Sequence, residues 1–246
     1  MRKVKFTVLG LSAGMALAVG MITLSSPLII QKASAEESVP VFQPQVVGAP
    51  TRRVGGGSRG MADGESLPSL AVLAPESTGR TINPRPALYW ATSKVIDKPF
   101  KFTLVYADPI KHGTTPVLEA DIEKPASGIQ GVDLAKHNIT LKPDVEYQWS
   151  VTIVMNPKQG ELSNDIVSQG TIELVKPSTE VSAQIAKANE QQLPFVYAKA
   201  GFWYDAIDSV SKLIDKEPKN QTLHKQRAAL LDQVGLKEFA ALDLKS

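Results

Sequence analysis

Apolar and polar residues alternate through the middle of this chain, which is the pattern of strands that bury one face. The alternation is clearest over residues 146–155, where Tyr147, Trp149 and Val151 are separated by polar neighbours. Prolines such as Pro143 fall in the breaks between such runs, and proline cannot donate to an interior strand ladder. The pattern therefore predicts a series of short strands with no helix between them, at 70–75, 87–92, 100–106, 117–122, 129–134, 138–141, 146–155 and 166–175.

The corner before the strongest of these strands narrows the fold class. Leu141, Pro143 and Asp144 form the corner, and Tyr147 follows it. A tyrosine in this place is a recurrent feature of immunoglobulin-like domains, where its hydroxyl bonds back to the corner backbone. We therefore expect a mainly β fold, with an immunoglobulin/fibronectin-like antiparallel β-sandwich over residues 70–177.

The period of the apolar residues changes to about 3.6 after Pro177, which indicates helices. Gly201 interrupts the pattern, and Pro218 interrupts it again. Asn220 is a suitable N-cap for the helix that follows, and Gly235 is a suitable stop. We expect a C-terminal helical module over residues 178–246, with about three helices, at 181–199, 202–215 and 223–234.

The first 35 residues have the order of an export signal. Arg2, Lys3 and Lys5 precede an apolar run, and Ala33 and Ala35 provide the small residues of a cleavage site. This order predicts a signal peptide over residues 1–35, cleaved after Ala35, and a periplasmic or secreted protein. The alternative is an uncleaved anchor, because the apolar run approaches the roughly 20 residues that span a bilayer.

Composition excludes several classes of function. The chain has no cysteine, which excludes a thiol nucleophile, a thiolate metal site and a lipidated cysteine anchor. Removing the signal, with its four basic residues, leaves 23 basic residues against 25 acidic ones, a net charge of −2. Binding to nucleic acid needs a concentrated basic surface, so no nucleic-acid partner is expected.

Residues 36–69 are rich in glycine, proline and arginine without hydrophobic periodicity, so they are predicted to form a flexible leader. Within the leader, residues 55–60 match G-x-G-x-x-G and, in another frame, G-x-S-x-G. A dinucleotide site or a nucleophile elbow needs its motif between a strand and a helix, and neither flank has that pattern. Both matches are therefore attributed to glycine density.

Few residues suggest catalysis or metal binding. His112, His137 and His224 have no spacing typical of metal ligands. Carboxylates in turns could act as a glycosidic acid–base pair or bind calcium, but acids in turns are ordinary solvated residues. We therefore expect no catalytic residue, no cofactor and no metal; the carboxylates concerned are Asp121, Glu123, Asp133, Asp144 and Glu146.

The aromatic residues offer a candidate contact surface. Trp90 and Trp149 lie on alternating strands and are expected in the core. Phe202, Trp203 and Tyr204 are consecutive, and three consecutive residues of one helix do not all face the same way. We therefore expect Phe202 and one neighbour to be buried, and we take Trp203 and Tyr204 as the candidate partner contact.

Two resemblances add to this interpretation. The stretch from Tyr197 through Asp205-Ala206-Ile207 to Pro218 and Asn220 resembles part of a tetratricopeptide repeat. Residues 50–236 as a whole resemble the bacterial family called domain of unknown function 928. That second resemblance is carried by Arg53–Gly60, Leu70–Pro75 with Gly79 and Thr81, Pro86–Trp90, Tyr147 with Trp149, and Gly201–Ala206. It implies an exported bacterial protein and no particular reaction.

These observations predict a non-enzymatic, exported interaction or scaffold protein of the bacterial cell envelope, with a protein partner in that envelope. A carbohydrate or peptidoglycan binding module that stacks sugars on exposed aromatic rings is the first alternative. A hydrolase that uses turn carboxylates is the second. Contact with a membrane is expected only through an uncleaved signal.

Overall fold

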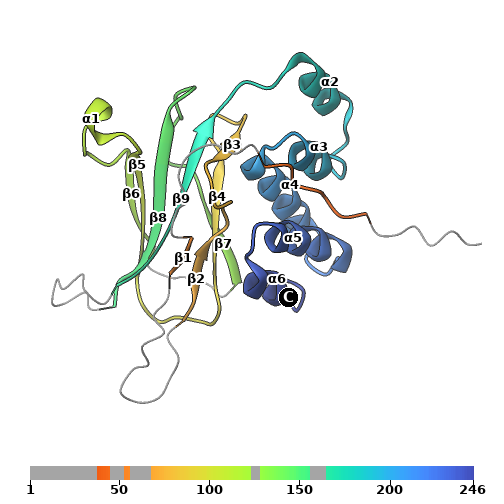
Figure 1. The fold of residues 1–246 in the computed structure, drawn as a ribbon. Helices are drawn as coiled ribbons and strands as arrows, with labels where there is room; N and C mark the ends of the chain where they lie inside the picture. Colours follow the sequence, from red (N-terminus) through yellow and green to blue (C-terminus); the bar gives the residue numbers. More distant parts are fainter. Residues whose placement is uncertain (1–37, 45–52, 56–67, 123–127, 156–164) are drawn as a thin grey trace, which may run out of the picture. The chain divides into compact units, whose positions relative to one another are not determined.

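The computed structural model describes residues 38–44, 53–55, 68–122, 128–155 and 165–246. All of them belong to one compact unit of the chain, residues 37–246 (Figure 1). The predicted signal peptide, most of the predicted leader with its glycine motifs, and Glu123 lie outside the described residues. The predictions made for those parts therefore stay predictions.

The described strands form two sheets. One has four strands in the order β1-β2-β4-β7, and the other has five in the order β3-β9-β8-β5-β6 (Figure 1). The strands are β1 (Val54–Gly55), β2 (Leu70–Val72), β3 (Gly79–Thr81), β4 (Ala87–Thr92), β5 (Phe100–Tyr106), β6 (Leu118–Ile122), β7 (Gly128–Asp133), β8 (Glu146–Ile153) and β9 (Ile166–Leu174).

One strand pairing differs from the antiparallel arrangement that was predicted. β3 runs parallel to β9, with Gly79 opposite Ile172, while the other named pairs are antiparallel. The cause is that the chain changes sheets between β2 and β3: β2 pairs with β4 in the four-stranded sheet, and β3 joins the edge of the five-stranded one. The second sheet is therefore mixed.

The two sheets share one apolar core. Along β8 the side chains alternate between buried and half-buried, and Trp149 and Val151 have no exposed surface. Leu88 and Trp90 of β4 belong to the same buried cluster as these residues. At Gly170 of β9 an added Cβ would lie 2.8 Å from the Cβ of Ala74, so the chain comes too close there for a side chain.

The corner before β8 has the predicted hydrogen bond. The backbone N–H of Lys142 donates to the Tyr147 hydroxyl at 3.1 Å. The predicted strand at 138–141 is wrong, because this stretch belongs to the turn and carries Asn138 at φ 55°. Asp144 at φ 58° completes the corner, so two residues in the left-handed region redirect the chain into β8.

Six helices lie in the described residues, and all but the first follow the sheets. The expectation of no helix between strands is wrong at α1, a single turn after β5. Asp108 caps that turn, since its carboxylate accepts from the N–H groups of Ile110 and Lys111 at 3.1 Å. The helices are α1 (Pro109–His112), α2 (Thr179–Lys187), α3 (Leu193–Lys199), α4 (Trp203–Lys216), α5 (Gln221–Gln233) and α6 (Lys237–Asp243).

The helix predicted at 181–199 is two helices. Asn189 and Gln192 each accept the backbone N–H of the other at 3.0 Å, and this reciprocal pair breaks the chain between α2 and α3. The predicted Asn220 cap is confirmed, because its side chain accepts from Thr222 N at 3.1 Å. Gly235, at φ 80°, turns the chain into α6, which the apolar pattern did not predict.

Candidate functional site

The candidate partner contact at Trp203 and Tyr204 lies inside the protein. Their side chains are 0% and 2% exposed, so we correct this prediction to an internal contact between α4 and the sheets. Trp203 Nε1 donates to the carbonyl of Leu73 at 2.8 Å. The Tyr204 hydroxyl accepts from Trp149 Nε1 at 2.9 Å and donates to the carbonyl of Thr171 at 2.8 Å.

Phe202, Trp203 and Tyr204 are all buried because α4 is covered on more than one side. It contacts β3 and β4 of the sheets, and it also packs on α3 and α5. Residues 38–44 add a further contact, since the ring of Phe42 meets that of Trp203 edge-on with centroids 4.9 Å apart. The expectation that one of the three aromatics would face solvent assumed a helix with a single buried side.

Residues 38–44 and 53–55 of the predicted leader are packed against the rest of the protein. Arg53 is buried; its guanidinium donates to the carbonyl of Ala74 at 3.1 Å and pairs with Glu76 at 2.8 Å. These residues of the predicted leader thus contact the folded part of the chain, and the flexibility of the leader stays a prediction. Composition alone does not indicate such contacts, because one arginine can anchor a segment through several hydrogen bonds.

The three histidines lie apart and have structural surroundings. His112 stacks on Tyr106 with ring centroids 4.7 Å apart, and His137 is exposed in a turn. His224 is buried; its Nδ1 lies 3.0 Å from an oxygen of Asp243, and that carboxylate also binds Arg227 at 2.6 and 2.8 Å. This buried ion pair joins α5 to α6.

Of the turn carboxylates, Asp144 and Glu146 line one recess of about 350 Å³, together with Asp108, Glu173 and His112, whereas Asp121 and Asp133 do not line it. Asp133 accepts from Ala135 N at 2.9 Å within its own turn, and Glu146 accepts from the Thr78 hydroxyl. Asp121 lies in the edge strand β6, and Asp144 lies in the corner before β8. In the part of the chain that the structure describes, no group of histidine and acidic side chains has the arrangement of a metal site.

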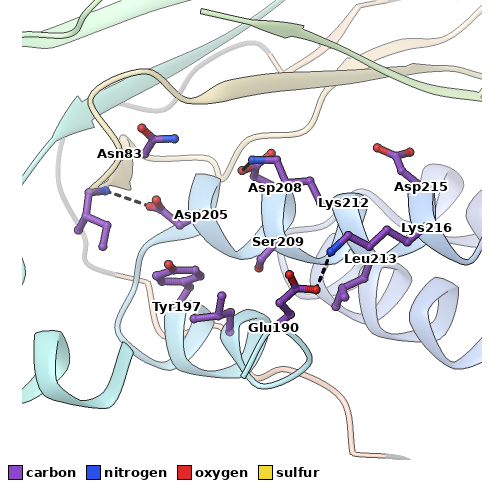
Figure 2. A pocket seen from close by; sticks show the side chains of 12 residues that line it. Asn83, Glu190, Tyr197, Asp205, Asp208, Ser209, Lys212, Leu213, Asp215 and Lys216 are labelled. Atoms are coloured by element: carbon purple, nitrogen blue, oxygen red, sulfur yellow. Dashed lines mark hydrogen bonds and ion pairs between the residues drawn. The ribbon is translucent and has the colours of Figure 1, made fainter. Parts of the chain in front are cut away.

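The structure contains a groove that the sequence analysis did not single out. Its volume is about 620 Å³, within the usual range of ligand-binding sites of roughly 300–1,000 Å³. It lies between α3, α4 and the turn that joins β3 to β4 (Figure 2). Its lining residues are Ile82, Asn83, Glu190, Leu193, Tyr197, Asp205, Asp208, Ser209, Lys212, Leu213, Asp215 and Lys216.

The polar wall of the groove comes from one face of α4. Asp205, Ser209, Lys212 and Lys216 recur at spacings of four, three and four residues, which place them in a row on a helix. Asp208 lies four residues before Lys212 and borders the same row. The other faces of α4 hold its apolar residues against the sheets and the neighbouring helices. This spacing was visible in the sequence, and it was the signal that could have drawn attention to the groove.

The opposite wall is the β3–β4 turn, which local hydrogen bonds hold in place. Asn83 N donates to the Thr81 hydroxyl at 3.0 Å, and Arg85 N donates to the Asn83 side chain at 3.0 Å. Ile82 N donates to a carboxylate oxygen of Asp205 at 3.0 Å. The last bond ties α4 directly to the turn.

Asp205 and Asp208 have different electrostatic surroundings. Burial raises the pKa of Asp205 to about 7, against the lowering effect of its hydrogen bonds from Ile82 and Thr81. Asp208 accepts from the Tyr89 hydroxyl at 2.9 Å and from Lys212 Nζ at 2.6 Å. Burial, with the Asp208 carboxylate as the next cause, raises the pKa of Tyr89, so this phenol remains a donor.

A second ion pair crosses the groove. Lys216 Nζ lies 2.6 Å from a carboxylate oxygen of Glu190, which precedes α3 (Figure 2). Both side chains are exposed, so the pair contributes little to stability and its charges are accessible. Leu193 and Leu213 add apolar lining to the groove. The site thus combines fixed carboxylates, two accessible ammonium groups and an apolar part.

The comparison with known protein families matches residues 54–244 to a family described as Domain of Unknown Function (DUF928). The match covers more than half of the chain, so the protein belongs to this family. No curated protein matches the chain at a significant level. Among the helices that the structure describes, none is long and apolar enough for a membrane span.

Proposed function

We propose that this protein is an exported, non-catalytic interaction protein of the bacterial cell envelope, and that the groove between α3, α4 and the β3–β4 turn is its binding site. The single observation that carries the proposal is the groove itself. The groove has a volume of about 620 Å³, and its lining includes both apolar side chains and charged groups. The N-terminal signal pattern, Arg2 to Ala35, supports export.

The state of the polar groups in the groove favours binding over catalysis. The Asp205 carboxylate accepts a hydrogen bond from Ile82 N, and the Asp208 carboxylate accepts from the Tyr89 hydroxyl and from Lys212 Nζ. A general acid–base pair needs carboxylates directed at a substrate, whereas these hold protein groups in place. The groove is therefore best understood as a shaped surface with accessible charges.

The two sheets support an immunoglobulin/fibronectin-like sandwich as the scaffold. The Tyr147 hydroxyl, bonded to the backbone five residues upstream, is the corner feature of the class. In the helical part, α3 packs on α4 and α5 on α6, as in paired helical repeats. We propose that these pairs are a partial tetratricopeptide-like unit that the sheets complete.

The charge of the groove indicates the chemistry of the partner. Four carboxylates and two ammonium groups line it, so the lining remains negative even when Asp205 carries a proton. A partner segment with a lysine or arginine beside an apolar side chain complements both parts of this surface. We therefore propose that the groove binds a basic, partly apolar segment of another envelope protein.

Charge substitutions test this partner chemistry by the sign of their effects. A photo-crosslinking residue in place of Ser209, with Ile110 on α1 as the matched exposed control, first captures the partner. Affinity of the purified partner is then measured for three variants by calorimetry. Lys216→Glu is expected to tighten binding and Asp215→Lys to weaken it, while Lys136→Glu, away from the groove, leaves it unchanged. The opposite signs would show an anionic partner and refute the proposal.

One observation favours a second candidate, a glycan ligand. Tyr197 is half-buried and lines the groove together with Asn83 and Asp208, and an aromatic ring in a groove with planar polar groups suits sugar binding. All three tryptophans are buried, so sugar stacking on tryptophan is excluded. Titration with soluble peptidoglycan fragments distinguishes the two candidates: saturable binding that Tyr197→Ala abolishes and Lys216→Glu does not affect would favour the glycan.

A further inference from the structure

Residues 38–44 are a segment without helix or strand that lies against the C-terminal helices (Figure 1). The backbone N–H of Gln43 donates to the carbonyl of Ala198 at 3.1 Å, at the end of α3. The side chain of Gln233 on α5 makes two further hydrogen bonds to the main chain of the segment. Its oxygen accepts from Phe42 N and its nitrogen donates to the carbonyl of Pro40, both at 2.8 Å. Three main-chain groups of the segment are therefore recognised.

Side chains of the segment are recognised at alternate positions. Pro40 is buried, and the Phe42 ring packs edge-on against Trp203 with centroids 4.9 Å apart. Val39 and Val41 point outward and are 40% and 62% exposed. Main-chain hydrogen bonds combined with pockets for alternate side chains are one recurring mode by which proteins bind extended peptides.

The segment is packed less tightly than an element of the core. A recess of about 360 Å³ lies beside it, lined by Phe42, Pro44 and residues of α5 and of the turn after β2. None of the contacts of the segment uses a residue that lines the groove between α3 and α4. The surface that binds residues 38–44 is thus separate from the groove. An inference about this surface does not depend on the function proposed for the groove.

We propose that the surface formed by Ala198, Trp203 and Gln233 is a peptide-docking site, and that residues 38–44 are its resident ligand. The ligand it takes is an extended segment with a proline two residues before an aromatic side chain, which Pro40 and Phe42 provide here. Proline restricts the unbound segment, so the segment loses less conformational entropy on docking. A segment of this kind can therefore bind, leave and bind again at a small entropic cost.

A displaceable resident ligand has a specific consequence for binding in trans. The segment is tethered to the same chain, so a free peptide competes with an effective concentration on the order of millimolar. A substitution that weakens the resident segment therefore raises the apparent affinity for the free peptide, because more of the sites are vacant. The same substitution in the free peptide lowers its affinity. A segment that is simply part of the fold predicts neither effect.

The test uses the full mature chain and a fluorescent peptide of residues 36–46, with binding measured by fluorescence anisotropy. We expect weak binding to the natural chain and binding about tenfold tighter or more to the Phe42→Ala chain. The natural peptide carrying Phe42→Ala should not bind. Val41→Ala, in chain or peptide, is the matched control and should change nothing, since that side chain faces outward.

Two further variants keep the test decisive. Gln43→Pro in the chain removes the donor to Ala198 without altering a buried side chain, and should tighten peptide binding as Phe42→Ala does. Adding Gln233→Ala to either chain should abolish the gained binding. Circular dichroism melts establish that each variant is folded. The proposal is overturned if folded Gln43→Pro and Phe42→Ala chains bind the peptide no better than the natural chain.

Discussion

The hydroxyl of Tyr204 links α4 to both β8 and β9, and Tyr204→Phe removes that hydroxyl alone. Trp149 Nε1 in β8 would lose its acceptor and the Thr171 carbonyl in β9 would lose its donor. Each buried polar group left without a partner costs about 1–3 kcal/mol. The surroundings leave little room to adjust, since a Cβ on Gly79 would lie 2.5 Å from the Tyr204 ring. We expect the free energy of unfolding to fall by about 2–4 kcal/mol.

Urea unfolding measures this loss, followed by tryptophan fluorescence and by far-ultraviolet circular dichroism. The two signals should give one coincident transition in both proteins, with an unchanged dependence on urea. Tyr197→Phe, in the groove, is the matched control and should change stability by less than about 0.5 kcal/mol. A double-mutant cycle with Trp149→Phe should give a coupling energy of about 1 kcal/mol or more.

Either of two results would refute the role given to the Tyr204 hydroxyl. One is a loss below about 0.5 kcal/mol for Tyr204→Phe, the usual size of a surface effect. The other is a helical signal that unfolds separately from the fluorescence signal, which would mean that the helices are an independent module.

Three further predictions concern other parts of the structure. Tyr147→Phe leaves Lys142 N without its acceptor at the corner and should cost about 1–2 kcal/mol in urea unfolding. Asp243→Asn leaves Arg227 buried beside a neutral partner and should cost about 3 kcal/mol or more by the same assay. The raised pKa of Asp205, about 7 against an ordinary 3.8, means that its contribution to stability is complete below pH 3.8 and is lost as the pH rises through 7. Asp205→Asn should therefore flatten the decline of the melting temperature between pH 4 and 8, and an unchanged decline would assign it to other groups.

The parts of the fold that follow local periodicity were predictable from the sequence. The strand at 87–92 has the predicted bounds, and the long strand around Trp149 and the helix beginning near Phe202 agree within a few residues. In each of these elements the pattern of apolar and polar residues is long enough to distinguish the period of a strand from that of a helix. The Tyr147 hydrogen bond was predictable as well, because a corner and its tyrosine are close in sequence.

The parts that depend on distant neighbours were not predictable. β1 and β3 have only two and three residues, too few for a period, and they form because a partner strand accepts them. Burial of Trp203 and Tyr204 together required knowledge that sheets and helices surround α4. The groove combines residues near 82, 190 and 205–216, which only the packing of α4 on the sheets brings together.

The groove exists only if α4 is held firmly against the sheets, because its two walls come from α4 and from the β3–β4 turn. Native-state hydrogen exchange measures the attachment of α4 to the sheets directly, through the opening free energy of individual amides. The amides of α4, residues 203–216, should open with the same free energy as those of β8, residues 146–153, and close to that of global unfolding. Amides of α4 that open at a clearly lower free energy than those of β8 would contradict it.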